Sequence, residues 1–314
     1  MAGAFIFWLI YKDQDIEQIK LVLKNDVNYY WVLVSLFIGL LSHISRAVRW
    51  RLMIEPIGHK PRLINTFSAV MVGYLMNMVL PRMGEISRCG VLSRYEKLSF
   101  TKLIGTVIAE RAIDMIIALI LLIIVIISQF GKVLEFVKSN PEIEEKLFAI
   151  VSSPVLIIGF IALVVFLIIF RKAFKHTTVY AKTVGILNNF KEGFISIGSI
   201  KKKFWFYFHS AFIWFLYYLM LYVNFFAFDF TKILSPIAGL TTFVMASFGM
   251  LAPVQGGIGA WHFMTKEALA LYGIPNESGI IFAFVAHSAM TLLMIVLGLI
   301  ALLILPFINR RGGV

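Results

Sequence analysis

The sequence predicts an all-α protein, a polytopic helical membrane bundle with two re-entrant broken helix pairs. The chain of 314 residues is 60% hydrophobic and 15% charged, and its mean hydropathy is +0.88. Several apolar runs exceed the roughly 20 residues that span a bilayer. Two further apolar segments are interrupted midway by proline and glycine. Broken helices are tolerated in lipid only where protein or a wet cavity satisfies the freed backbone groups, so these two segments indicate buried hairpins.

Five uninterrupted segments are long and apolar enough to be predicted as spans. They cover residues 28–54, 103–127, 148–170, 204–228 and 280–305. The interrupted segments, 63–94 and 233–273, lie between these spans. Each breaks at a proline–glycine stretch, around Pro81 in the first and Pro253 in the second.

The charges that flank the first interrupted segment indicate that it returns to the side from which it enters. Basic residues lie before it, among them Arg51, and after its break, among them Arg94. If segment 63–94 crossed once, the strongly basic stretch 171–203 would lie outside, against the preference of Lys and Arg for cytoplasmic loops. We therefore interpret both interrupted segments as re-entrant pairs that enter from opposite faces, with their tips near mid-membrane. Opposite entry fits an inverted-repeat transporter.

The chain is predicted to form a single transmembrane domain over residues 1–314. Its expected parts are a first half over 28–170 with the pair 63–94, a basic cytoplasmic amphipathic linker over 171–203, and a second half over 204–305 with the pair 233–273. The linker is expected on the inner leaflet, attracted to anionic headgroups. The last span should end inside, at Arg310. These features predict a multi-pass protein of the cell inner (plasma) membrane with a cytoplasmic C-terminus.

The positive charge is explained by membrane orientation, and we expect no nucleic-acid partner. The net charge is +12, and the basic residues cluster just outside apolar segments. The single cysteine, Cys89, excludes an internal disulfide. The histidines do not pair with carboxylates or cysteines at metal-ligand spacing, and the sequence has no P-loop, so neither a metal nor another cofactor is expected.

The first break has charged residues that suit an anion. A helix that begins after Gly84 places Glu85 in its first turn, on the same face as Arg88. Anions are favoured at helix N-termini, so Arg82 and Arg88 form a candidate clamp for phosphate or carboxylate. In the alternative interpretation, Glu85 only caps the helix and Arg88 extends to the membrane interface.

The span after the first hairpin has three charged residues in its interior. Glu110 and Asp114 lie one turn apart on one face, and Arg111 can reach Asp114. A carboxylate at this depth needs a partner. Two interpretations remain open here. The carboxylates either neutralise Arg82 or Arg88 and lock the bundle, or bind a cation or proton that powers transport.

The second break is rich in glycine, and polar residues follow it. Glycines permit a tight turn and close backbone approach, and a helix that begins near Gly259 presents a second positive end. The candidate binding residues here are Gln255, Gly256, Gly257, His262, Lys266 and Glu267. The alternative is a turn that only reverses direction, with Lys266 and Glu267 at the outer interface.

Three further polar residues have simpler expected roles. His43 and Arg46 share a face near the cytoplasmic end of their span, and we interpret them as interfacial anchors. The alternative is that they extend the basic pocket. His287 is expected to be a packing residue with a satisfied side chain.

Four motifs, in order over nearly the whole chain, resemble the flippase-like domain, the transmembrane region of lysylphosphatidylglycerol synthase/flippase proteins. They are Arg46-Ala47-Val48-Arg49-Trp50-Arg51, then Asn77-x-x-Leu80-Pro81-Arg82-x-Gly84-Glu85-x-x-Arg88, then Glu110-Arg111-x-x-Asp114, and Pro253-x-x-Gly256-Gly257-Ile258-Gly259. The resemblance implies a helical bundle with re-entrant helices that moves a polar lipid between leaflets. Larger members have a soluble aminoacyltransferase domain. The sequence to Val314 contains none, so lysyl transfer is not expected.

These observations predict a lipid translocase, not an enzyme, that moves a phosphate-bearing or aminoacylated polar lipid between leaflets. Arg82 and Arg88 would hold the phosphate, and Glu85 or Asp114 would meet a cationic amine. The alternatives are an intramembrane transferase acting on a lipid-linked substrate, with Glu85, Glu110 or Asp114 as base, and a small-ion carrier. The expected partners are membrane phospholipids or other polar lipids. A homodimer is compatible with the sequence.

Overall fold

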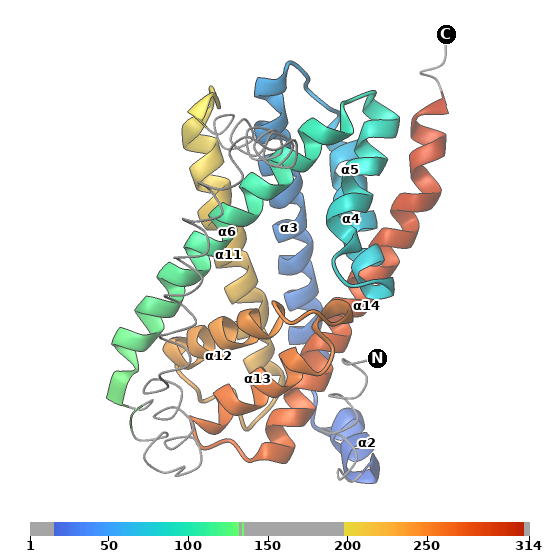
Figure 1. Cartoon of the computed structure of the whole chain (residues 1–314). Helices are drawn as coiled ribbons and strands as arrows, with labels where there is room; N and C mark the ends of the chain where they lie inside the picture. Colours follow the sequence, from blue (N-terminus) through green and yellow to red (C-terminus); the bar gives the residue numbers. More distant parts are fainter. Residues whose placement is uncertain (1–15, 132–133, 135–197, 311–314) are drawn as a thin grey trace, which may run out of the picture.

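The computed structural model describes residues 16–131, 134 and 198–310, and its regular structure there is entirely helical (Figure 1). Four described helices are long and apolar enough to cross a membrane. They are α3 (Tyr29–Ile54), α6 (Phe100–Ser128), α11 (Lys203–Val223) and α14 (Asn276–Ile308). The predicted all-α membrane bundle is therefore confirmed. The predicted span 148–170, and the linker 171–203 up to residue 197, lie outside the described residues.

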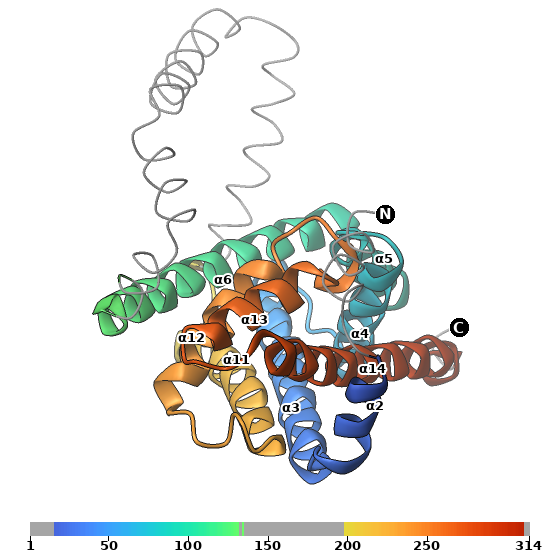
Figure 2. The same cartoon turned by 90° about the horizontal axis from the view of Figure 1, so that it is seen from below.

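The centre of the bundle is formed by α3 and α11, which pack against each other along their length (Figures 1 and 2). The side chain of Asn28 caps α3 by accepting a hydrogen bond from the backbone of Tyr30. The backbone N–H of Asn28 also donates to the carbonyl of Ala227, 2.9 Å away, so the start of α3 is tied to the end of the α11 region. One short helix that we did not predict, α2 (Ile16–Asn25), precedes α3.

The first hairpin consists of α4 (Leu63–Val79) and α5 (Met83–Glu96), which lie side by side. With 17 and 14 residues, both helices are shorter than a full span. Two glycines allow them to approach closely, because a Cβ on Gly84 would collide with the carbonyl oxygen of Gly73. The helix α5 begins one residue before Gly84, and Glu85 lies in its first turn as expected.

The second hairpin consists of α12 (Pro236–Gly249), the 3-10 turn η3 (Gln255–Gly257) and α13 (Ala260–Ala270). The Ser235 side chain caps α12. Two glycines at the tip, Gly256 and Gly257, have φ of 56° and 76°, a left-handed conformation that glycine adopts without steric cost. The glycine-rich sequence at this tip is therefore required for the chain to turn back.

The two hairpins lie in opposite halves of the bundle, and their tips meet near its middle (Figure 1). The helices α4 and α5 occupy the half towards the C-terminus, whereas α12 and α13 occupy the other half. The sulfur of Met78, near the end of α4, lies directly against Gly256 of η3. The hairpins predicted from the two proline–glycine breaks are thus present and touch each other.

Candidate functional site

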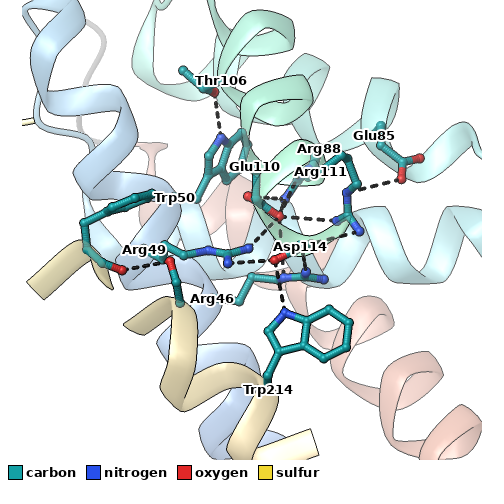
Figure 3. A network of polar contacts seen from close by, with 12 residues as sticks. Arg46, Arg49, Trp50, Glu85, Arg88, Thr106, Glu110, Arg111, Asp114 and Trp214 are labelled. Carbon is teal, nitrogen blue, oxygen red and sulfur yellow. Dashed lines mark hydrogen bonds and ion pairs between the residues drawn. The ribbon is translucent and has the colours of Figure 1, made fainter. Parts of the chain in front are cut away.

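Seven charged side chains from three helices form one network inside the bundle (Figure 3). The network joins α3, α5 and α6. Its members are Arg46, Arg49, Glu85, Arg88, Glu110, Arg111 and Asp114. A group of this kind inside a membrane bundle is costly to bury and generally marks a functional site.

Helical spacing brings these residues together. Arg46 and Arg49 are three residues apart on α3, and Glu110 and Asp114 are four apart on α6, so each pair projects from one face. Glu110 lies about 15 Å along α6 from its first residue, at 1.5 Å per residue. The first hairpin adds Arg88 from α5. The network therefore requires the hairpin to be folded between the two spanning helices.

Glu110 is completely buried and lies at the centre of the network. Arg88 donates from Nη1 to both of its carboxylate oxygens, at 3.3 and 3.2 Å. Arg111 donates from Nη2 to Oε1 at 3.3 Å. The guanidinium groups of the two α3 arginines lie 3.4 and 3.5 Å from the same oxygen. One carboxylate oxygen is thus surrounded by four arginines.

Asp114 holds the two arginines of α3 more tightly. Arg46 Nη2 lies 2.6 Å from Oδ2, and Arg49 Nη1 lies 2.7 Å from Oδ1. The indole Nε1 of Trp214 on α11 reaches the same Oδ1 at 3.4 Å. Short charge-assisted bonds of this kind are among the stronger polar contacts in proteins. Asp114 therefore links α3, α6 and α11.

The prediction that His43 and Arg46 anchor α3 at the interface is wrong. Their exposed fractions are only 3% and 5%. Arg46 points inward because its partners are carboxylates on α6, more than 60 residues later in the chain. The His43 ring packs against Tyr74 at 4.8 Å, and neither of its nitrogens has a hydrogen-bond partner among the described residues.

Trp50 orients the arginine that the hairpin contributes. The Arg88 guanidinium lies 4.7 Å from the centre of the Trp50 ring, a cation–π contact. The indole Nε1 donates to Thr106 Oγ1 at 2.9 Å, which fixes the ring. Arg88 is 4% exposed, so the interpretation that it extends to the membrane interface is wrong.

A small cavity adjoins the network, between the first hairpin and helices α3 and α6. Its volume is about 20 Å³, which is room for about one water molecule. Three arginines line it, Arg46, Arg88 and Arg111, together with Glu85 and the side chain of Asn77. The seven-residue network has four arginines against three carboxylates, a formal charge of +1. The cavity therefore suits an anion.

Arg82, the second residue of the predicted clamp, does not line this cavity. Arg82 is exposed in the turn before α5, with φ of 63°, and is not a member of the network. Glu85 and Arg111 are partly exposed and 3.9 Å apart. Of the two partners proposed for Glu110, the structure pairs it with Arg88. Glu110 thus lies as the locking interpretation expects, whereas Asp114 pairs with Arg46 and Arg49 instead of Arg82 or Arg88. Cation or proton binding stays a prediction.

The residues predicted at the second break do not form one group, because Lys266 lies against Gly279 near the start of α14 and not at the η3 tip. His287 on α14 contacts the carbonyl oxygen of Gly256 through Nε2 at 2.9 Å, so its expected role as a satisfied packing residue is confirmed. The rings of His262 and His287 lie 4.6 Å apart. Lys266 pairs with Glu267 at 2.7 Å, and both side chains are partly buried. Gln255 and Gly257 shape the turn itself.

Sequence reasoning missed three site residues, Arg49, Tyr74 and Trp214. Tyr74 accepts a hydrogen bond from Arg46 and lies 3.1 Å from the hydroxyl of Tyr217. The spacing of Arg46 and Arg49 on one helical face was an available signal for the first of them. No signal marked the two aromatic residues.

Over residues 16–131, 134 and 198–310, no group of His, Cys, Asp and Glu could hold a metal ion.

The chain resembles known membrane proteins. The family model described as "Lysylphosphatidylglycerol synthase TM region" matches residues 1–298. A UPF0104 membrane protein of Methanocaldococcus jannaschii is 28% identical over 111 residues, which are 34% of this chain and 32% of that protein. The match thus spans about a third of the relative's length. No solved structure matches the chain.

Proposed function

Because the chain belongs to the family of the lysylphosphatidylglycerol synthase TM region, we propose that it is a translocase that moves a phosphate-bearing or aminoacylated polar lipid between leaflets. The family assignment indicates a function connected with membrane lipids. The finer statement, leaflet-to-leaflet transport, rests on the arginine-lined cavity beside the first hairpin.

The cavity is the observation that carries the proposal. Three of its lining residues are arginines, and Arg46 and Arg88 are almost fully buried. Arginine guanidinium groups match the planar, bidentate geometry of phosphate oxygens better than lysine does. The main barrier to lipid translocation is the desolvation of a charged headgroup. A site that replaces water with fixed positive donors lowers that barrier.

The hairpins supply the path. One enters the bundle from each end, and their tips touch at Met78 and Gly256. A headgroup that passes along the first hairpin meets Arg88 and Arg111, while its acyl chains remain in the bilayer beside the apolar outer faces of the helices. Glu85 lies at the exposed side of the cavity and is 32% exposed, so it is placed to meet an ammonium group on the headgroup.

The buried carboxylates favour transport over a transferase reaction. A general base must accept a proton from the substrate within hydrogen-bond distance. Both oxygens of Asp114 already accept hydrogen bonds from arginine, and so do both oxygens of Glu110. We propose that neither acts as a base.

We also propose the plasma membrane as the site of action, with the basic C-terminal end of α14 on the cytoplasmic side.

Reconstitution tests the proposal. The purified protein is placed in liposomes that contain a fluorescent phosphatidylglycerol. A quencher that acts only on the outer leaflet is added, and the rate at which inner-leaflet lipid becomes quenched is measured. Lipid mass is recorded in the same samples. We expect faster leaflet exchange than in protein-free liposomes and no new lipid species. A new lipid species would indicate the transferase, and exchange no faster than in protein-free liposomes would contradict the proposal.

A further inference from the structure

The carboxylate of Glu110 occupies the position in which an anion receives the most positive contacts. Its Oε1 lies 3.2 Å from Arg88 Nη2, 3.3 Å from Arg111 Nη2 and 3.4 Å from Arg49 Nη2. Arg46 Nε follows at 3.5 Å. These four arginines come from three different helices, so Glu110 is the point at which they converge.

One carboxylate oxygen cannot satisfy all of these donors. It offers two lone pairs, whereas four guanidinium groups face it. Accordingly, the Nη2 of Arg88, the Nη2 of Arg49 and the Nε of Arg46 are buried and have no hydrogen bond of adequate geometry. Buried donors without partners are rare in native proteins and require an explanation. A lipid phosphodiester has two anionic oxygens, as a carboxylate does, and its two ester oxygens are additional, weaker acceptors for these donors.

The cavity beside these arginines is too small to admit a phosphate while Glu110 stays in place. Its volume of about 20 Å³ holds about one water molecule. Glu110 is held mainly by the arginines that line this cavity, Arg88 and Arg111 above all. Phosphate and the Glu110 carboxylate would therefore use the same donors.

We propose that Glu110 is a built-in substitute for the lipid phosphate, which occupies the arginine cluster when no headgroup is bound and is displaced when one enters. This inference rests on the proposed function, because it assigns a regulatory role at the same site. With the carboxylate in place, the formal charge of the seven-residue network is +1 between transport events, instead of +2 without it. The returning carboxylate also competes with the phosphate, which promotes release of the headgroup.

The effect of Glu110→Gln on ligand binding tests this role. The probe is short-chain dihexanoyl phosphatidylglycerol, added to detergent-solubilised protein, and the readouts are the Kd and the ligand-dependent rise in Tm. Removal of the competing charge should tighten binding by about tenfold, a typical effect for a close buried charge pair, and should slow leaflet exchange. The matched control is Glu96→Gln, because Glu96 is a partly buried acceptor outside the network. It should bind as the wild type does.

Inorganic phosphate, used as a second probe, separates two sources of the anion. Tighter binding of both probes supports displacement by any phosphate group, and tighter binding of the lipid alone supports displacement by the lipid headgroup. Unchanged or weaker binding by a folded Glu110→Gln would overturn the inference. If wild type exchanges lipid in that case, the proposed function still stands, whereas a wild type that neither binds nor exchanges lipid overturns both.

A second variant covers the case in which Glu110→Gln does not fold. Glu110→Asp keeps the negative charge but withdraws the carboxylate by one methylene from the four arginines. Tighter binding of dihexanoyl phosphatidylglycerol than in wild type would support the inference, and equal or weaker binding would overturn it. A purely structural role for Glu110 predicts a lower Tm in both variants without any gain in ligand affinity.

Discussion

Arg88 of the first hairpin and Glu110 of α6 form an ion pair in which both side chains are almost entirely buried. Their closest atoms are 3.2 Å apart, and the pair connects a helix too short to span the membrane to one that is long enough. Breaking a buried pair is costly because it leaves an uncompensated charge. A change at either residue should therefore affect both the position of the hairpin and the site.

Asp114→Asn should destabilise the protein strongly. The change leaves Arg46 and Arg49 without their closest negative partner, and loss of one partner of a buried pair costs about 3–5 kcal/mol. We expect a clear fall in the Tm of the detergent-solubilised protein. Asp229→Asn is the control, because Asp229 is exposed and pairs with Lys232 on the surface. Equal Tm values for the two variants would show that the Asp114 contacts do not stabilise the bundle.

Gly84→Ala should open the first hairpin. A Cβ there would lie within 2.6 Å of the Asn77 side chain and collide with the Gly73 carbonyl, and overpacking of this kind costs about 1–3 kcal/mol. We expect a lower Tm. The matched control is Gly90→Ala on the same helix, where a Cβ meets nothing within 4 Å. It should raise stability slightly, because alanine favours helix over glycine. A lower Tm for Gly90→Ala would show that the destabilisation by Gly84→Ala is not caused by a lack of space for the Cβ.

Gly256→Ala should slow leaflet exchange through its effect on the contact between the tips. The new Cβ would push aside the flexible end of the Met78 side chain on the other hairpin, and we expect a loss of about tenfold, which corresponds to ~1.4 kcal/mol on the barrier. Gly273→Ala is a matched control for backbone strain. Gly273 also has a positive φ, 79°, but a Cβ there has no neighbour within 4 Å. If both variants slowed exchange equally, strain rather than tip contact would be responsible.

Glu85→Gln should alter headgroup preference. Glu85 is the partly exposed carboxylate of the cavity, so its loss should slow exchange of fluorescent phosphatidylethanolamine, which bears an ammonium group, more than that of phosphatidylglycerol. The measured quantity is the ratio of the two exchange rates. Glu277→Gln, on the exposed first turn of α14, should leave the ratio unchanged. The assignment of Glu85 fails if its variant shows the wild-type ratio.

The fold was largely predictable from the sequence. The hydrophobic runs predicted α3, α6, α11 and α14 with boundaries within a few residues, because length and apolarity alone are strong signals for spans. The two hairpins followed from the proline–glycine breaks together with the loop charges. The start of α5 at Met83 instead of after Gly84 is a small difference, since helix ends are the least certain part of such predictions.

The site was only partly predictable. Glu110, Asp114 and Arg88 were recognised because charged residues inside apolar helices are conspicuous. Arg46 was misinterpreted because a basic residue near a helix end normally marks the cytoplasmic side, and its orientation depends on how α3 packs against α6. That packing, and the approach of Trp214 from α11, is tertiary information that a single sequence does not contain.

The most direct measurement of the central claim compares leaflet exchange by Arg88→Gln and Arg94→Gln in liposomes. Both arginines lie on α5, but Arg88 is buried beside the cavity and Arg94 is exposed. Each variant is first shown to retain a cooperative thermal transition. The account predicts that Arg88→Gln loses leaflet exchange of fluorescent phosphatidylglycerol and that Arg94→Gln retains it. Wild-type exchange by a folded Arg88→Gln would contradict the account.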